Sequence, residues 1–200
     1  MDIALYGGSF NPAHVGHHLV AALVLATQPV DELWFVPTYK HMLGKELLDF
    51  EHRLEMCRLM ARDLPRTSVC RAEQRLAKQP GFVGSRTIDL VKYVQEEWPN
   101  DRFRLILGSD LVDSFTTWEG WAEIVEIAPP IVVRRDGYDL PALAAHAVVP
   151  DISSTMVKKR IVDGEDFRQL VHQDVADYIV KHGLYDVFGR GQLMRTLMPQ

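Results

Sequence analysis

One stretch near the start of the chain decides the fold: Tyr6-Gly7-Gly8-Ser9-Phe10-Asn11-Pro12-Ala13-His14-Val15-Gly16-His17-His18. A short apolar run at residues 3–6 precedes it and predicts a strand. Apolar residues at helical spacing follow it and predict a helix, namely Leu19, Ala22, Leu23 and Ala26. We therefore expect the stretch to connect a first strand to a first helix.

Adjacent glycines and a pair of histidines give this connection its chemistry. We expect Gly7 and Gly8 to form a turn where the backbone takes positive φ and a ligand approaches the main chain. His14 and His17 are spaced to lie on one face of the first helical turn. The N-terminus of a helix has free N–H groups and a partial positive charge, which suit phosphate. The stretch therefore predicts a polyphosphate site.

The pattern differs from two common phosphate-binding motifs. It is not a Walker A loop, because no Gly-Lys-Ser/Thr follows, and its glycine spacing is not the dinucleotide-binding fingerprint. A purely structural interpretation, in which the histidines cap or pack the helix start, explains Gly16 poorly because glycine weakens helices. We expect Gly16 to let a phosphate approach instead.

Composition limits the class of protein. A chain of 200 residues suggests one domain, and 47% hydrophobic residues are ample for a core. The formal net charge of −5 argues against a general nucleic-acid-binding protein. Cys57 and Cys70 are too few for a disulfide framework. No apolar run approaches the ~20 residues that span a bilayer, and the chain begins with a strand pattern instead of a signal peptide, so we expect a cytoplasmic protein with no membrane partner.

Strand and helix patterns alternate along the rest of the chain. Further strands are expected at residues 33–36, 68–71, 103–107, 131–133 and 147–149. Helices are expected at residues 50–61, 88–95, 155–162 and 167–181. This alternation predicts a Rossmann-like α/β fold, with a doubly wound parallel sheet, helices on both faces and a small C-terminal helical part. Ligands of such folds bind outside the carboxyl ends of the strands, where the opening stretch would lie.

A second helix start also carries phosphate-binding chemistry. Hydroxyl groups gather there after a predicted strand, in the run Ile152-Ser153-Ser154-Thr155, and Lys158 follows one turn later. Simple N-capping explains one hydroxyl, because Ser and Thr are preferred caps. Several hydroxyls and a lysine also suit phosphate, and both interpretations stay open.

The motifs, taken in order over residues 3–185, resemble the bacterial nicotinate-nucleotide adenylyltransferase family, within the nucleotidyltransferases that carry a His-x-Gly-His motif. The first motif is the most specific, and the order of the later ones supports it: Ser85-x-Thr87-x-Asp89, Leu107-Gly108-Ser109-Asp110 with Trp118, Val133-Arg134-Arg135-x-Gly137-Tyr138, Ile152-Ser153-Ser154-Thr155 and Tyr178-Ile179-x-x-x-Gly183-Leu184-Tyr185. The resemblance implies a nucleotidyltransferase domain over residues 1–185. Residues 186–200 would be a tail or an oligomer contact, so a homo-oligomer is open.

The resemblance implies adenylyl transfer from ATP to nicotinate mononucleotide, giving nicotinate adenine dinucleotide and pyrophosphate in NAD biosynthesis. The attacking phosphate is largely dianionic at pH 7 and needs no general base. His14 and His17 would be the catalytic residues. Mg²⁺ would arrive with ATP and be held mainly by its phosphates, without a dedicated protein site. The implied ATP-binding residues are Gly8, Ser9, Phe10, His14, His17, Gly108, Asp110, Ile152, Ser153, Ser154, Thr155 and Lys158.

The resemblance also implies a site for the second substrate. The ring of Trp118 would stack on the pyridine, and the helix start at Thr87 would meet the nicotinate carboxylate. Arg134 would reach a phosphate or pair with an acid at the sheet edge. Lys45 is assigned to substrate, with Lys40 as the alternative for the same contact. In the same way, Lys158 and Arg160 stay open as the cation beside the second helix start.

Other functions fit parts of the pattern. A related adenylyltransferase would use nicotinamide mononucleotide or phosphopantetheine, and the latter should lack the pyridine site at Thr87 and Trp118. A nucleotide-binding sensor without catalysis is the alternative from another class. The presence of both motif histidines argues against the sensor.

Overall fold

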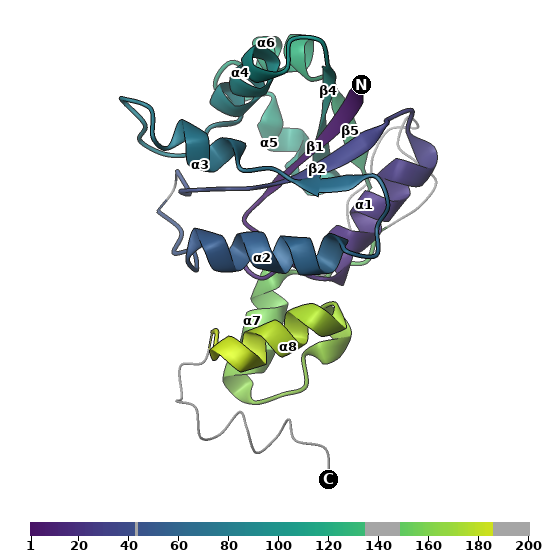
Figure 1. Ribbon diagram of the computed structural model, residues 1–200, viewed down its shortest axis with the longest axis vertical. Helices are drawn as coiled ribbons and strands as arrows, with labels where there is room; N and C mark the ends of the chain where they lie inside the picture. Colours follow the sequence, from purple (N-terminus) through teal and green to yellow (C-terminus); the bar gives the residue numbers. More distant parts are fainter. Residues whose placement is uncertain (43, 135–148, 186–200) are drawn as a thin grey trace.

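The computed structural model describes residues 1–42, 44–134 and 149–185, and only the backbone of residues 112 and 113 (Figure 1). Its centre is a five-stranded sheet in the order β3-β2-β1-β4-β5. Each neighbouring pair of strands is parallel. The strands are β1 (Asp2–Gly8), β2 (Glu32–Pro37), β3 (Thr67–Val69), β4 (Arg102–Gly108) and β5 (Pro130–Val133).

Helices cover both faces of the sheet, which confirms the Rossmann-like prediction. One apolar core includes residues of α1, α2, α7 and α8, and a second includes residues of α3, α4 and α6. Figure 1 shows α7 and α8 at the opposite end of the molecule from α4 and α6. The helices are α1 (Val15–Thr27), α2 (Phe50–Ala61), α3 (Ala72–Leu76), α4 (Thr87–Glu97), α5 (Val112–Phe115), α6 (Trp121–Ile127), α7 (Ser154–Asp163) and α8 (Gln173–His182), with 3₁₀ turns η1 (Ser109–Leu111) and η2 (Arg168–Leu170).

The central strand β1 runs further than the sequence predicted. Its last residues, Gly7 and Gly8, pair with Val36 and Pro37 of β2, so both glycines are part of the strand. The positive φ expected at the glycines falls instead on Phe10, at 45°. The predicted glycine turn is therefore wrong, because pairing with β2 keeps the chain extended through Gly8.

Helix α1 was predicted correctly, but its buried face was not. The residues that α1 buries are Gly16, Val20, Ala21, Val24 and Leu25. Leu19, which was expected on the apolar face, is 42% exposed. Every residue from 19 to 26 of α1 is apolar, so spacing alone does not select a face.

Several other elements differ from the predictions. Strand β3 covers residues 67–69 instead of 68–71. The helix expected at 167–181 is divided into η2 and α8, because His172 caps α8 by accepting a hydrogen bond from the Asp174 N–H. The short helices α3, α5 and α6 were missed. Of the strand expected at 147–149, only Val149 belongs to the described residues, and its N–H donates to the Arg134 carbonyl at 3.0 Å.

The C-terminal part is hydrogen-bonded to the stretch at residues 6–18. The Tyr185 hydroxyl donates to Oδ1 of the buried Asn11 at 2.9 Å. The same oxygen accepts the Leu48 N–H at 3.4 Å. Asn11 therefore joins three segments that are distant in sequence. Within the described ranges, no helix has both the length and the apolarity needed to cross a membrane.

Replacing Tyr185 by Phe should lower the free energy of unfolding by about 1 kcal/mol, because Asn11 loses its shorter hydrogen bond in a buried place. Urea denaturation of the two proteins measures this difference. Tyr178→Phe is a matched control, since the Tyr178 hydroxyl contacts His52 at the α2–α8 surface. We expect the control to change stability by less than about 0.5 kcal/mol. Equal stability of Tyr185→Phe and the unmodified protein would show that the hydrogen bond from Tyr185 to Asn11 does not stabilise the fold.

Candidate active site

A cavity of about 850 Å³ lies at the carboxyl ends of the strands. Residues from the ends of β1, β2, β4 and β5 line it, and so do the first residues of α1, α4 and α7. This is the place where doubly wound sheets bind ligands. The cavity therefore collects three helix N-termini around one space.

Most of the residues that the sequence singled out line this cavity. They are Gly8, Ser9, His14, His17, Lys45, Thr87, Gly108, Asp110, Trp118, Ile152, Ser153, Ser154 and Thr155. Three others are not in the lining: Phe10, Lys158 and Arg134. Phe10 lies beneath the site, 1% exposed, with its ring centroid 4.7 Å from that of His17. Arg134 follows the end of β5.

The two motif histidines form a stacked pair. Their ring centroids are 3.6 Å apart and their planes differ by 27°. His14 is the N-cap of α1, and its backbone N–H donates to Nδ1 of His17 at 3.2 Å. Because Nδ1 of His17 is an acceptor, the proton of the neutral ring lies on Nε2. His17 therefore offers an Nε2–H donor at the cavity wall.

Gly16 has a packing role that the sequence did not reveal. A Cβ atom at Gly16 would lie 3.0 Å from Nδ1 of His14 and 3.2 Å from the Ile152 carbonyl oxygen. The Ser154 hydroxyl adds a second link, because it donates to the Pro12 carbonyl at 2.8 Å. The expectation that Gly16 serves only ligand approach was therefore incomplete, since it also lets the starts of α1 and α7 come together.

The hydroxyl-rich start of α7 contains the N-cap that the simpler interpretation expected, and its phosphate-binding role stays a prediction. Ser153 is the N-cap, and its side chain accepts the Met156 N–H at 3.3 Å. Ser154 is engaged with Pro12, and Thr155 lines the cavity. Capping by Ser153 organises the first turn of α7 and leaves its N-terminus facing the cavity.

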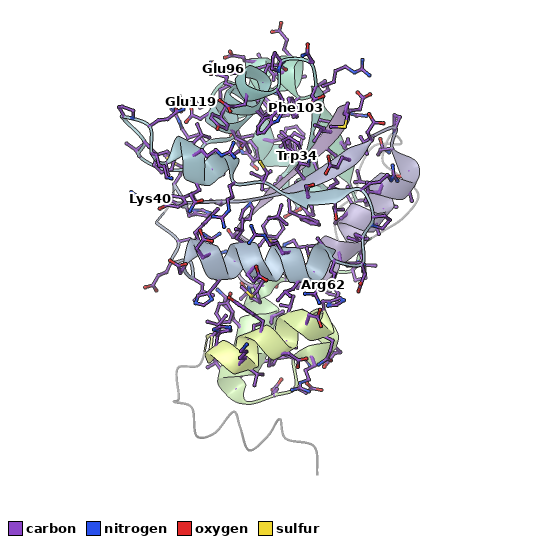
Figure 2. The ribbon with its side chains drawn as sticks, in the orientation of Figure 1. Trp34, Lys40, Arg62, Glu96, Phe103 and Glu119 are labelled. Atoms are coloured by element: carbon purple, nitrogen blue, oxygen red, sulfur yellow. The ribbon has the colours of Figure 1, made fainter. Side chains whose placement is uncertain are left out.

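Two lysines approach each other beside the cavity. Burial, and then the nearby Lys45, lowers the pKa of Lys158 from its ordinary value. Lys45 lines the cavity, whereas Lys40 is exposed and lies at the periphery of the molecule in Figure 2. Arg160 donates to the Asp166 carbonyl at 2.9 Å. Lys45 is therefore at the cavity and Lys40 is not, whereas neither Lys158 nor Arg160 is in the cavity lining.

The start of α4 forms another wall. Arg86 is the N-cap of α4, but its side chain makes no capping hydrogen bond. It instead donates to the Asp89 carboxylate, with Nε–Oδ2 at 2.7 Å and Nη2–Oδ1 at 2.9 Å. The first turn of a helix has N–H groups without helical partners, and Thr87 lines the cavity here together with Trp118. Trp121 packs on Phe115 instead, with ring centroids 4.6 Å apart.

Sequence reasoning missed two buried charged residues near the site. Arg53 of α2 is 1% exposed, and Glu73 of α3 is 5% exposed and lines the cavity. Burial raises the pKa of Glu73 to about 7, against opposing interactions with the Ser85 hydroxyl and the Tyr39 N–H. Oε2 of Glu73 is buried with no hydrogen-bond partner in the described part of the chain. For Arg53 a signal existed, because it lies on the same helical face as the apolar Phe50 and Cys57.

Glu73 should make stability depend on pH. Its pKa is about 7 in the folded protein and 4.5 ordinarily, so between these values the folded state holds a proton that the unfolded chain has released. Stability should therefore fall as pH rises through this window, by about 3 kcal/mol in all. Glu73→Gln should remove this component.

Denaturation of the Glu73→Gln variant and the unmodified protein between pH 5 and 8 tests this expectation. The stability difference, variant minus unmodified, should increase with pH. Glu55→Gln is the control, because the Glu55 side chain is 38% exposed on α2. A stability difference for Glu73→Gln that stays constant from pH 5 to 8 would show that Glu73 does not have the raised pKa.

Comparison with known proteins identifies the family. A model of the cytidylyltransferase-like family matches residues 5–160. The chain is 44% identical to the probable nicotinate-nucleotide adenylyltransferase of Anaeromyxobacter sp. (strain K), over 92% of this chain and 96% of that protein. It is 30% identical to the nicotinate-nucleotide adenylyltransferase of Bacillus subtilis (strain 168), over 92% and 98%.

A solved structure supports the fold independently. Plasmodium falciparum nicotinic acid mononucleotide adenylyltransferase, complexed with NaAD, superposes with a TM-score of 0.75 at 24% identity, over 92% of this chain and 97% of that one. These matches confirm the resemblance that the ordered motifs indicated. The chain belongs to the cytidylyltransferase-like family and, within it, to the nicotinate-nucleotide adenylyltransferases.

Proposed function

We propose that the cavity at the end of the sheet transfers the adenylyl group of ATP to nicotinate mononucleotide and releases pyrophosphate. Membership of the family supports the choice of reaction and of substrates over nicotinamide mononucleotide and phosphopantetheine. The observation that carries the placement is the stacked His14–His17 pair at the cavity wall. Residues 1–185 would be the catalytic domain, with residues 186–200 as a tail.

The reaction suits a site that positions and stabilises charge. A phosphate oxygen of the mononucleotide attacks the α-phosphorus of ATP. The bond from that phosphorus to the oxygen that bridges the α- and β-phosphates breaks, and this oxygen leaves as a terminal oxygen of pyrophosphate. The attacking phosphate is already largely dianionic at pH 7, so no base has to remove a proton. The protein therefore has to hold two anionic groups in line and to neutralise the charge that develops between them.

The ATP phosphates would lie between the N-termini of α1 and α7. The Nε2–H of His17 would donate to an α-phosphate oxygen, and this interaction strengthens as the five-coordinate centre forms. Thr155 and the first turn of α7 would hold the β- and γ-phosphates, where the helix dipole favours negative charge. Lys158 would neutralise the departing pyrophosphate, and an anion there would relieve the repulsion between Lys158 and Lys45.

The mononucleotide would lie on the α4 side of the cavity. The Trp118 ring would stack on the pyridine, and the first turn of α4 at Thr87 would donate N–H groups to the carboxylate. Lys45 would bind the attacking phosphate. Phe10 would act from beneath by packing on His17. The contacts assigned to Arg134 and Lys158 stay predictions, since neither residue is in the cavity lining.

Mg²⁺ fits the oxygen-rich site as an ion that arrives with ATP. Asp110 lines the cavity and would supply a carboxylate ligand beside the phosphate oxygens, which matches the preference of Mg²⁺ for few protein ligands. When bound, the ion withdraws charge from the phosphates. The cytoplasm, where the free thiols Cys57 and Cys70 would remain reduced, is the proposed location.

Replacing His17 by Ala should lower kcat by about 10²–10³, the loss seen when a donor to a developing oxyanion is removed. Release of pyrophosphate from ATP, Mg²⁺ and nicotinate mononucleotide measures the rate. His18→Ala is the matched control, because Nδ1 of His18 contacts the Met60 carbonyl at 3.3 Å, outside the cavity lining. The same kcat in both variants would overturn the assignment of His17.

Nicotinate mononucleotide should be preferred over nicotinamide mononucleotide by roughly fivefold or more in kcat/KM. The reason is that N–H groups bind a carboxylate about 1 kcal/mol more strongly than a neutral amide. Parallel assays with the two mononucleotides measure this ratio. A ratio near one would contradict the proposed carboxylate site at Thr87. Binding of ATP without turnover of either mononucleotide would favour the alternative function, a nucleotide-binding sensor without catalysis.

A further inference from the structure

The buried guanidinium of Arg53 is bonded to the backbone of three separate segments. Its Nε donates to the Leu48 carbonyl at 2.8 Å, its Nη1 to the Ser9 carbonyl at 2.9 Å and its Nη2 to the Tyr39 carbonyl at 3.5 Å. Arginine keeps its proton in proteins even where burial lowers its pKa, as it does here. A buried charge is costly without polar partners, so these carbonyls and the guanidinium hold each other in place.

Two of these carbonyls are the ends of one segment. The chain leaves the sheet after β2, passes Tyr39, carries His41, Met42 and Lys45 along the cavity wall and returns at Leu48 before α2. Arg53 therefore closes the base of the segment that bears Lys45.

The segment is also held by its neighbours. The Ser85 hydroxyl oxygen accepts the N–H groups of Tyr39 and Lys40, each at 3.2 Å. These bonds fix the segment against the loop before α4, whereas the bonds of Arg53 fix it against α2 and the strand end.

The third carbonyl belongs to the motif that bears the histidines. Ser9 is the first residue after β1, and the chain reaches His14 within the next turn. Through one planar group, Arg53 therefore sets the position of the Lys45 segment relative to the turn that leads to the histidine pair. A lysine at this position would keep the charge but could not reproduce the fork of donors.

We propose that Arg53 is a positioning residue that holds Lys45 at the correct distance from His14 and His17. This inference rests on the proposed function, in which Lys45 binds the attacking phosphate and His17 the phosphate under attack. Arg53 touches neither substrate. Arg53 would affect the rate by setting the distance and alignment between the attacking phosphate and the α-phosphate. A misplacement of about 1 Å between two reacting groups can slow a reaction by up to about 10²-fold.

Replacing Arg53 by Lys should lower kcat about 10- to 100-fold. The Kd for a non-hydrolysable ATP analogue should change by less than about threefold, because α1 and α7 still form the ATP side of the cavity. Arg66→Lys is the matched control, since Arg66 donates to the Leu25 and Val30 carbonyls at 2.7 and 3.0 Å, away from the cavity. Rates are normalised to the folded fraction, and Arg53→Gln is the second variant if the lysine protein is poorly folded. A kcat for both Arg53 variants equal to that of Arg66→Lys would overturn the proposal.

A double-mutant cycle with Lys45→Met separates positioning from general stability. If Arg53 acts through Lys45, then Arg53→Lys should cost less than about threefold in the Lys45→Met background, although it costs 10- to 100-fold alone. Independent effects that multiply would overturn the proposal, and so would a Lys45→Met protein of unchanged activity, because nothing would then need positioning. Unchanged activity of Lys45→Met would also remove Lys45 from the proposed substrate contacts. Neither result affects the proposed reaction or the role of His17, which depend on the separate comparison of His17→Ala with His18→Ala.

Discussion

The hydrogen bond from the His14 N–H to Nδ1 of His17, at 3.2 Å, is the constraint on which the site depends. It requires His14 at the N-cap and His17 in the first turn of α1, so it exists only if the helix begins at Val15. By making Nδ1 an acceptor, it leaves the proton of the neutral ring on Nε2. A backbone feature thereby determines which atom of a side chain can donate to a phosphate.

The surroundings of this bond are packed to keep it in place. Below it, the Phe10 ring lies under Gly8, where a Cβ atom would approach Cζ of Phe10 to 3.2 Å. Beside it, Gly16 lets the start of α7 come against α1. The result is two helix N-termini that face one cavity, and their partial positive charges suit a polyphosphate without many basic side chains. This arrangement is consistent with a chain whose formal net charge is −5.

Local patterns predicted the fold and much of the candidate site, whereas long-range contacts were hidden. The apolar runs and the spacing of His14 and His17 act over a few residues, so the sequence shows them directly. The partners of Arg53 include a carbonyl 44 residues away, and the Tyr185–Asn11 bond spans 174 residues. The buried face of α1 could not be chosen because every residue from 19 to 26 is apolar. The φ of 45° at Phe10 was missed because glycine was the expected residue for such a conformation.

The decisive measurement is which nitrogen of the His17 ring carries the proton. In a protein labelled with ¹⁵N at its imidazoles, long-range NMR correlations distinguish a ring nitrogen that bears a proton from one that does not. We expect a proton on Nε2 of His17 at neutral pH, an unprotonated Nδ1, and a shift of the Nε2 signal when a non-hydrolysable ATP analogue and Mg²⁺ are added. A proton on Nδ1 alone, or an Nε2 signal that does not respond to the analogue, would contradict this expectation.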